Sequence, residues 1–72
     1  MSRRYFFEIL ANRLSCPDSK GMEHPTIASA ITYGQRVADE IGSEAEYRDA
    51  IVLVFDDTGR WIAELNCQLQ KA

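Results

Sequence analysis

The fold is decided by residues 50–65, which read AIVLVFDDTGRWIAEL. Two apolar runs of strand length flank the tetrad Asp56-Asp57-Thr58-Gly59, and a polar loop with Gly between such runs is typical of a β-hairpin. The second run contains the only tryptophan of the chain, Trp61. We therefore predict two paired strands joined at this turn.

The geometry of the turn fixes which side chains share a face, and two registers are open. In a type I turn with Gly59 left-handed in a bulge, Leu53 faces Trp61. Without the bulge Val54 faces Trp61, since a one-residue slip moves every side chain across the sheet. We favour the bulged register, with Trp61 in the core. In that register one face carries Ile51, Leu53, Phe55, Trp61, Ala63 and Leu65, and the other carries Val52, Val54 and Ile62 with Arg60 and Glu64.

A second pair of strands is predicted near the N-terminus. Arg4–Leu10 has the period-2 pattern and the aromatic content of a strand, with Tyr5 and Phe7 directed into the core. Asn12-Arg13 is then a tight connection to a short strand, Leu14–Cys16.

Pro17 ends that short strand because it has no backbone N–H to donate. Asp18-Ser19-Lys20-Gly21 has the Asp and Gly positions of a turn. We expect Met22 and Glu23 to extend or resume an edge strand.

One long helix is predicted from Thr26 to Ile41. Thr26 supplies an N-cap hydroxyl, and Gly42 stands where a left-handed C-terminal cap is expected. Gly34 lowers helix propensity by about 1 kcal/mol relative to alanine, so we interpret it as a point of close approach to the sheet. The apolar stripe that should face the sheet comprises Ile27, Ala30, Ile31, Gly34, Val37, Ala38 and Ile41.

These elements give the order strand, strand, helix, strand, strand within one domain, residues 1–72. One helix on an antiparallel or mixed sheet of about four strands, an α+β fold, buries the apolar stripe of the helix. Residues 43–49 connect the helix to the hairpin and have room for a single helical turn. The tail is predicted to fray after Leu69.

Composition and charge restrict the class of protein. With 46% apolar and 26% charged residues the chain is globular rather than disordered, and its net charge of -3 argues against binding driven by nucleic-acid phosphates. No run approaches the roughly 20 apolar residues of a membrane span, and the start Met1-Ser2-Arg3-Arg4 leads into no signal-peptide core. We expect a cytoplasmic protein without membrane association, in which Cys16 and Cys67 are reduced thiols.

His24, Cys16 and Cys67 are the residues that could form a metal site or a thiol-based catalytic site. Neither cysteine has a partner two to four residues away, as zinc signatures require. Asp56 and Asp57 occupy a turn that calls for Asp, and the scattered glycines form no phosphate-binding loop. We predict no catalytic residue, no metal and no cofactor.

Four motifs follow one another along nearly the whole chain. They are Arg4-Tyr5-Phe6-Phe7, Asp18-x-x-Gly21 with Glu23, Pro25-Thr26 leading to Ala30, and Val52-x-Val54-x-Asp56-Asp57-x-Gly59-Arg60. In this order they resemble the DUF6894 family of small uncharacterised bacterial proteins, mainly from alphaproteobacteria. The chain departs from that family at Glu8, where His is common, at Thr26, where an acidic residue is common, and at Asn66-Cys67, where Pro-Phe is common. The resemblance implies this fold and a bacterial setting, and it implies no activity.

The chain has more apolar side chains than one helix can cover on one sheet face. We expect either a surface that binds protein, formed by Phe6, Val52, Val54 and Ile62, or cover from loops and the N-terminal hairpin. The function is therefore unknown, and our first hypothesis is a small non-enzymatic interaction module that binds an unknown protein or forms a homodimer. The first alternative is a nucleic-acid-binding or antitoxin-like regulator, an analogy of fold only. The second is a thiol-dependent or metal-dependent enzyme.

Overall fold

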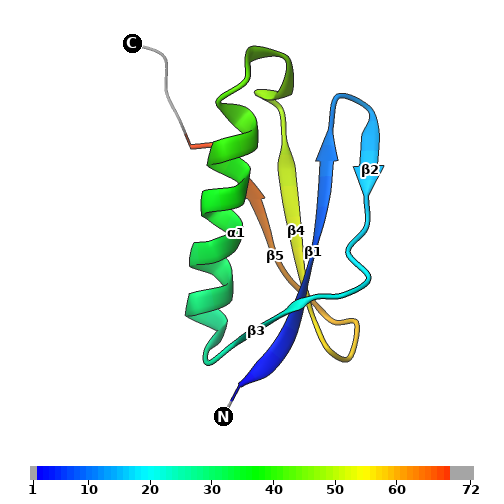
Figure 1. The fold of residues 1–72 in the computed structure, drawn as a ribbon, viewed down its shortest axis with the longest axis vertical. Coiled ribbons are helices and arrows are strands. Elements are labelled where there is room, and N and C mark those ends of the chain that lie inside the picture. The colour runs from blue at the N-terminus through cyan, green and yellow to red at the C-terminus, as the bar shows by residue number, and fades with distance from the viewer. Residues whose placement is uncertain (1, 69–72) are drawn as a thin grey trace.

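The computed structural model describes residues 2–68 and has two layers, one helix and one antiparallel sheet (Figure 1). The helix is α1 (Ile27–Gly42), and a short 3-10 turn, η1 (Ala45–Tyr47), follows it. The strands are β1 (Arg3–Ala11), β2 (Leu14–Cys16), β3 (Met22–His24), β4 (Ile51–Asp56) and β5 (Trp61–Asn66). The predicted α+β fold is confirmed, with β3 as a fifth strand before the helix. The predicted fraying after Leu69 falls outside the described residues.

The outer edge of β1 is hydrogen-bonded to two short strands and to the side chain of Asp18. The sheet order is β2-β1-β4-β5, and β2 and β3 pair with the two ends of β1 on its outer edge. Between them the carboxylate of Asp18 accepts a hydrogen bond from the backbone N–H of Phe7 (3.1 Å). The same carboxylate accepts from the N–H groups of Lys20 (3.1 Å) and Gly21 (3.0 Å). Asp18 therefore takes the place of a strand at the middle of this edge.

The tight connection between β1 and β2 is confirmed. Asn12 and Arg13 have φ angles of 50° and 68°, the left-handed backbone of a two-residue hairpin turn.

The β4–β5 hairpin has the predicted turn but neither of the two predicted registers. The N–H of Gly59 donates to the carbonyl of Asp56 (3.1 Å), and Gly59 has φ 84°. Phe55 pairs with Trp61, whereas Val54 pairs with Ala63, so Ile62 is an extra residue in β5. The turn places Trp61 on the face that carries Phe55, as the favoured register predicted, and the extra residue moves Ala63 and Leu65 to the opposite face.

The core lies between α1 and the sheet face that carries Tyr5, Phe7, Val52 and Val54, and these side chains are 0–7% exposed. The predicted burial of Tyr5 and Phe7 is confirmed. The prediction that Trp61 lies in the core is wrong, because Trp61 is 57% exposed on the opposite face.

Small residues let α1 approach the sheet closely. The buried helix positions recur every four residues and are Ala30, Gly34, Ala38 and Gly42. A Cβ atom on Gly34 would lie 2.8 Å from Leu65 Cδ1, which confirms the predicted close approach. Ile27, predicted to face the sheet, is 48% exposed because it lies at the start of the helix.

The two predicted helix caps have different outcomes. Thr26 is the N-cap, and its hydroxyl accepts from the N–H of Ser29 (3.0 Å). Gly42 is the last helical residue rather than a left-handed cap, and the cap is Ser43 in a right-handed conformation. Gly42 is needed for space, because a Cβ atom there would overlap Cys67.

Candidate functional site

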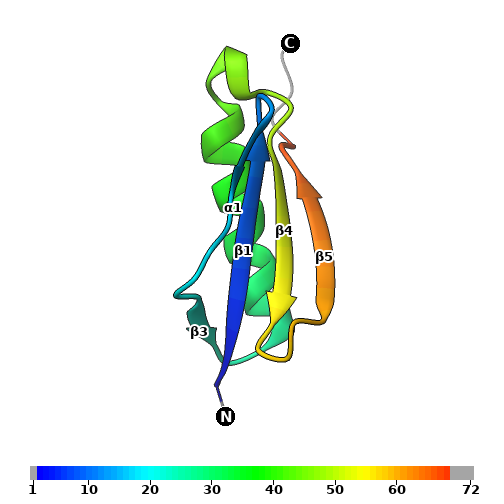
Figure 2. The ribbon, with the colours of Figure 1, turned by 90° about the vertical axis from the view of Figure 1, so that its right-hand side faces the viewer.

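The sheet face opposite α1 is the first candidate site. In Figure 2, β1, β4 and β5 lie in front of α1, and within residues 2–68 no element covers them on the viewer's side. Across the three strands, Phe6 pairs with Phe55 and Phe55 pairs with Trp61. These three aromatic side chains form a row, which we call the aromatic row. Trp61 is exposed, and Phe6 and Phe55 are partly buried.

Charged side chains flank the aromatic row. On the side toward the β1–β2 turn, Glu8 pairs with Leu53 and Leu53 pairs with Glu64, so two carboxylates stand on either side of one apolar residue. On the other side, Arg4 lies two residues before Phe6 and points to the same face. The guanidinium of Arg4 donates to the carbonyl of Lys20 (2.9 Å) and lies 3.5 Å from Glu23. The sheet face opposite α1, which we call the open face, therefore carries the Arg4–Glu23 ion pair at one end and the carboxylates of Glu8 and Glu64 at the other.

Of the four residues predicted to form an interaction surface, only Phe6 lies on the open face. Phe6 lies on the open face, because it alternates with the buried Tyr5 and Phe7. Val52 and Val54 are 0% exposed beneath α1, and Ile62 packs against the core, so these three do not form the surface.

The open face also contains residues that were not predicted to form the surface, namely Leu53, Phe55 and Trp61. The alternation of β4 places Leu53 and Phe55 together. The favoured bulged register already placed Trp61 on one face with Leu53 and Phe55, but the sequence could not show that α1 covers the opposite face.

The comparison with protein families identifies this chain. A family described as a domain of unknown function, DUF6894, matches residues 4–68. The chain belongs to the DUF6894 family. The resemblance stated from its motifs is confirmed, and the family description assigns no activity. No curated protein and no solved structure is significantly similar to this DUF6894 chain.

The residues once considered for metal binding or thiol catalysis are separated in this DUF6894 fold. Cys16 pairs with Ile9 and His24 pairs with Arg3, six residues apart on β1, which corresponds to roughly 20 Å. Cys67 contacts Gly42 at the C-terminal end of α1, whereas His24 binds Ser29 near its N-terminal end. Both thiols are unpaired, and residues 2–68 contain no cluster of three metal-ligating side chains.

Asp56 is a buried carboxylate with a structural role in the hairpin. Its Oδ1 accepts from the Thr58 hydroxyl (2.7 Å) and from the backbone N–H groups of Thr58 (2.9 Å) and Arg60 (3.0 Å). The hydrogen bond from the Thr58 hydroxyl contributes most to lowering the pKa of Asp56, and it outweighs the opposing effect of burial. Arg3 lies 3.7 Å from the same carboxylate. These contacts support the interpretation of Asp56 as a turn residue.

Within the described residues, α1 is not both long and apolar enough to cross a bilayer.

Proposed function

We propose that this chain is a small protein-interaction module that binds a second copy of itself through the open sheet face, and that it acts by binding rather than by catalysis. The observation that carries the proposal is the aromatic row, in which Trp61 is 57% exposed beside Phe55 on the face away from α1. Exposed apolar patches on small proteins are typical of interfaces. Trp is also one of the side chains enriched among residues that dominate binding energy.

The charge pattern favours a second copy as the partner. A two-fold axis through the aromatic row, perpendicular to the strands, would stack one row on the other. It would also place Arg4 of each copy over Glu8 of the other, because both lie on β1, two residues to either side of Phe6. Such self-complementarity is what a two-fold interface requires, and opposite charges fix its orientation.

The size of the open face sets the expected strength of this association. Three strands of about six residues span roughly 14 by 20 Å. This is a smaller footprint than that of standard interfaces, which bury about 800 Å² per partner. We therefore expect a weak dimer, with a dissociation constant on the order of 100 µM.

Sedimentation velocity at roughly 10 µM and roughly 1 mM protein tests the proposal. We expect monomer at the lower concentration and mostly dimer at the higher one. Trp61→Lys should be monomeric at both, because two ammonium groups would be buried opposite each other. Leu14→Lys is the matched control, since Leu14 is 61% exposed on β2 but on the helix side of the sheet, and it should behave like the wild type. A wild type that stays monomeric at the higher concentration, or a Trp61→Lys variant that still dimerises, contradicts the proposal.

The cellular setting is part of the same proposal. We place this module in the bacterial cytoplasm, and two unpaired cysteines support that placement because reducing compartments preserve free thiols. Fractionation of cells that produce the chain at native level, followed by immunodetection, tests the location. Recovery in the periplasmic or membrane fraction contradicts it.

A further inference from the structure

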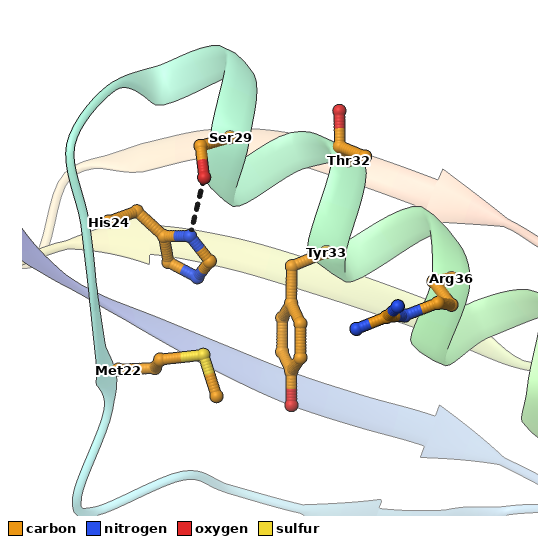
Figure 3. A pocket seen from close by; sticks show the side chains of 6 residues that line it. All are labelled: Met22, His24, Ser29, Thr32, Tyr33 and Arg36. Carbon is orange, nitrogen blue, oxygen red and sulfur yellow. Dashed lines mark hydrogen bonds between the residues drawn. The ribbon is translucent and has the colours of Figure 1, made fainter.

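A groove between β3 and the first half of α1 lies on the helix side of the sheet, away from the open face. It has a volume of about 540 Å³, in the range of small-molecule pockets. Its lining residues are Met22, His24, Ser29, Thr32, Tyr33 and Arg36 (Figure 3). The four helix residues lie three, four and seven positions apart, so they share one face of α1.

His24 is held in one orientation at the inner end of this groove. Its Nδ1 is hydrogen-bonded to the hydroxyl oxygen of Ser29 (2.9 Å). Its ring also makes aromatic contacts with Phe7 and Tyr33, with ring centroids 5.8 and 5.5 Å away. The imidazole is thus fixed before any ligand arrives.

The second ring nitrogen of His24 has no hydrogen-bond partner in the described part of the chain. The residue is 7% exposed, and within residues 2–68 its Nε2 is a buried nitrogen with no hydrogen bond. Figure 3 shows Nε2 on the side of the ring that faces Met22 and Tyr33. When the Ser29 hydroxyl donates to Nδ1, the proton of the neutral ring is on Nε2 and needs an acceptor. Met22 is 40% exposed and flexible, so its side chain can move aside for one.

Arg36 provides a cation at the outer end of the groove. Its guanidinium carbon lies 6.0 Å from the centroid of the Tyr33 ring, and Figure 3 shows the guanidinium turned toward that ring. No Asp or Glu among residues 2–68 forms a salt bridge with Arg36. Ser29, the partner of His24, and Arg36 are seven residues apart, about 10 Å along the helix.

We propose that this groove binds a small organic acid with an aromatic or apolar body and a second oxygen at its far end. The carboxylate pairs with Arg36, because guanidinium and carboxylate form the strong two-point hydrogen bond. The body lies against Tyr33 and Met22. The far oxygen accepts from Nε2 of His24 and satisfies the nitrogen that is otherwise buried without a partner.

NMR titration of the full chain with 4-acetylbenzoate tests this site, because that probe has a carboxylate at one end and a carbonyl oxygen at the other. We expect saturable shifts at His24, Tyr33 and Arg36, with a dissociation constant on the order of 1 mM. The neutral 4-acetylbenzamide, which lacks the charge, should bind at least about tenfold more weakly. Benzoate, which lacks the carbonyl, should also bind more weakly than 4-acetylbenzoate.

Two variants test the two ends of the site independently. Arg36→Gln should weaken 4-acetylbenzoate binding by about tenfold or more, whereas Arg60→Gln on the distant hairpin turn should leave it unchanged. His24→Phe, with folding checked by circular dichroism, should remove the advantage of 4-acetylbenzoate over benzoate.

Absence of saturable shifts overturns the proposal, as does equal binding of the acid and the amide or equal binding by Arg36→Gln. Binding of inorganic phosphate in place of 4-acetylbenzoate also overturns it, because the body of the ligand would then contribute nothing. Each of these outcomes is independent of whether the open face dimerises.

Discussion

Asp18→Asn tests the role of one side chain in completing the edge of the sheet. The change keeps the size of the side chain but replaces one carboxylate oxygen with an NH₂ group. In the wild type Oδ2 accepts from the N–H of Phe7, and Oδ1 accepts from two N–H groups of the turn. In the variant the remaining side-chain oxygen can stay at the turn and accept the two hydrogen bonds there. The NH₂ group then faces the N–H of Phe7, so two hydrogen-bond donors oppose each other.

The expected loss follows from these three hydrogen bonds. An unsatisfied backbone N–H costs about 1–3 kcal/mol, and each turn bond loses about 1 kcal/mol when its acceptor is no longer charged. We expect the free energy of unfolding to fall by roughly 2–4 kcal/mol, allowing for the solvent exposure of the turn. A core of this size supplies only roughly 3–5 kcal/mol, so the variant should be close to unfolded.

Urea unfolding followed by circular dichroism at pH 7 measures this loss. With a slope of about 1 kcal/mol per molar urea, the midpoint should fall by about 2 M or more. Asp49→Asn is the matched control, because Asp49 is an exposed carboxylate in the connection between η1 and β4 and its replacement should leave the midpoint unchanged. An Asp18→Asn midpoint within about 0.3 M of the wild type would refute the reasoning.

The same experiment at low pH tests the charge of Asp18. Partial burial raises the pKa of this carboxyl, but the N–H groups of Gly21, Phe7 and Lys20 outweigh burial, so its pKa lies below the ordinary value near 3.8. A lowered pKa in the folded state means that the carboxylate contributes stability above the unfolded pKa and loses it as the pH falls through the folded pKa. The difference between wild type and Asp18→Asn should therefore shrink between about pH 5 and pH 2. A difference that is constant over this range contradicts a role for the charge.

Three further predictions concern the hairpin. Val54→Ala should lower the free energy of unfolding by roughly 2–3 kcal/mol, because Val54 is 0% exposed. Trp61→Ala should lower it by only about 1–2 kcal/mol in dilute protein, because Trp61 is 57% exposed. Equal urea midpoints for the two variants, or the reverse order, would show that Trp61 is buried. Gly59→Val should lower the urea midpoint by strain alone, since Gly59 has φ 84° and a Cβ atom there would meet no atom of residues 2–68 within 4 Å. A Gly59→Asn variant should lose much less stability, and equal losses would contradict this cause. Asp56→Asn should reduce the acid sensitivity of unfolding, because the lowered pKa of Asp56 makes its stabilising charge disappear as the pH falls through the folded pKa; an unchanged pH profile contradicts this.

The sequence did not indicate that the residues of the groove between β3 and α1 lie together. His24 was considered as a metal ligand because it is the only histidine, but the neighbours of its ring come from β1 and α1. Arg36 and Tyr33 were outside any predicted site, since helical spacing alone does not show which strand end the helix crosses. Their relation to His24 arises from the pairing of β3 with β1, which brings residue 24 back under the helix.

The sequence by itself determined the local structure of this protein. Strand alternation, the Thr26 cap, the Asp56–Gly59 turn and the small residue at Gly34 are short-range signals, because each depends on backbone conformation or on spacing within a few residues. Only the tertiary structure decided which apolar side chains form the core and which form the open face. Strand side chains alternate with a period of two, so the extra residue at Ile62 was enough to put Ala63 and Leu65 beneath α1 while Trp61 stayed with Phe55 on the open face.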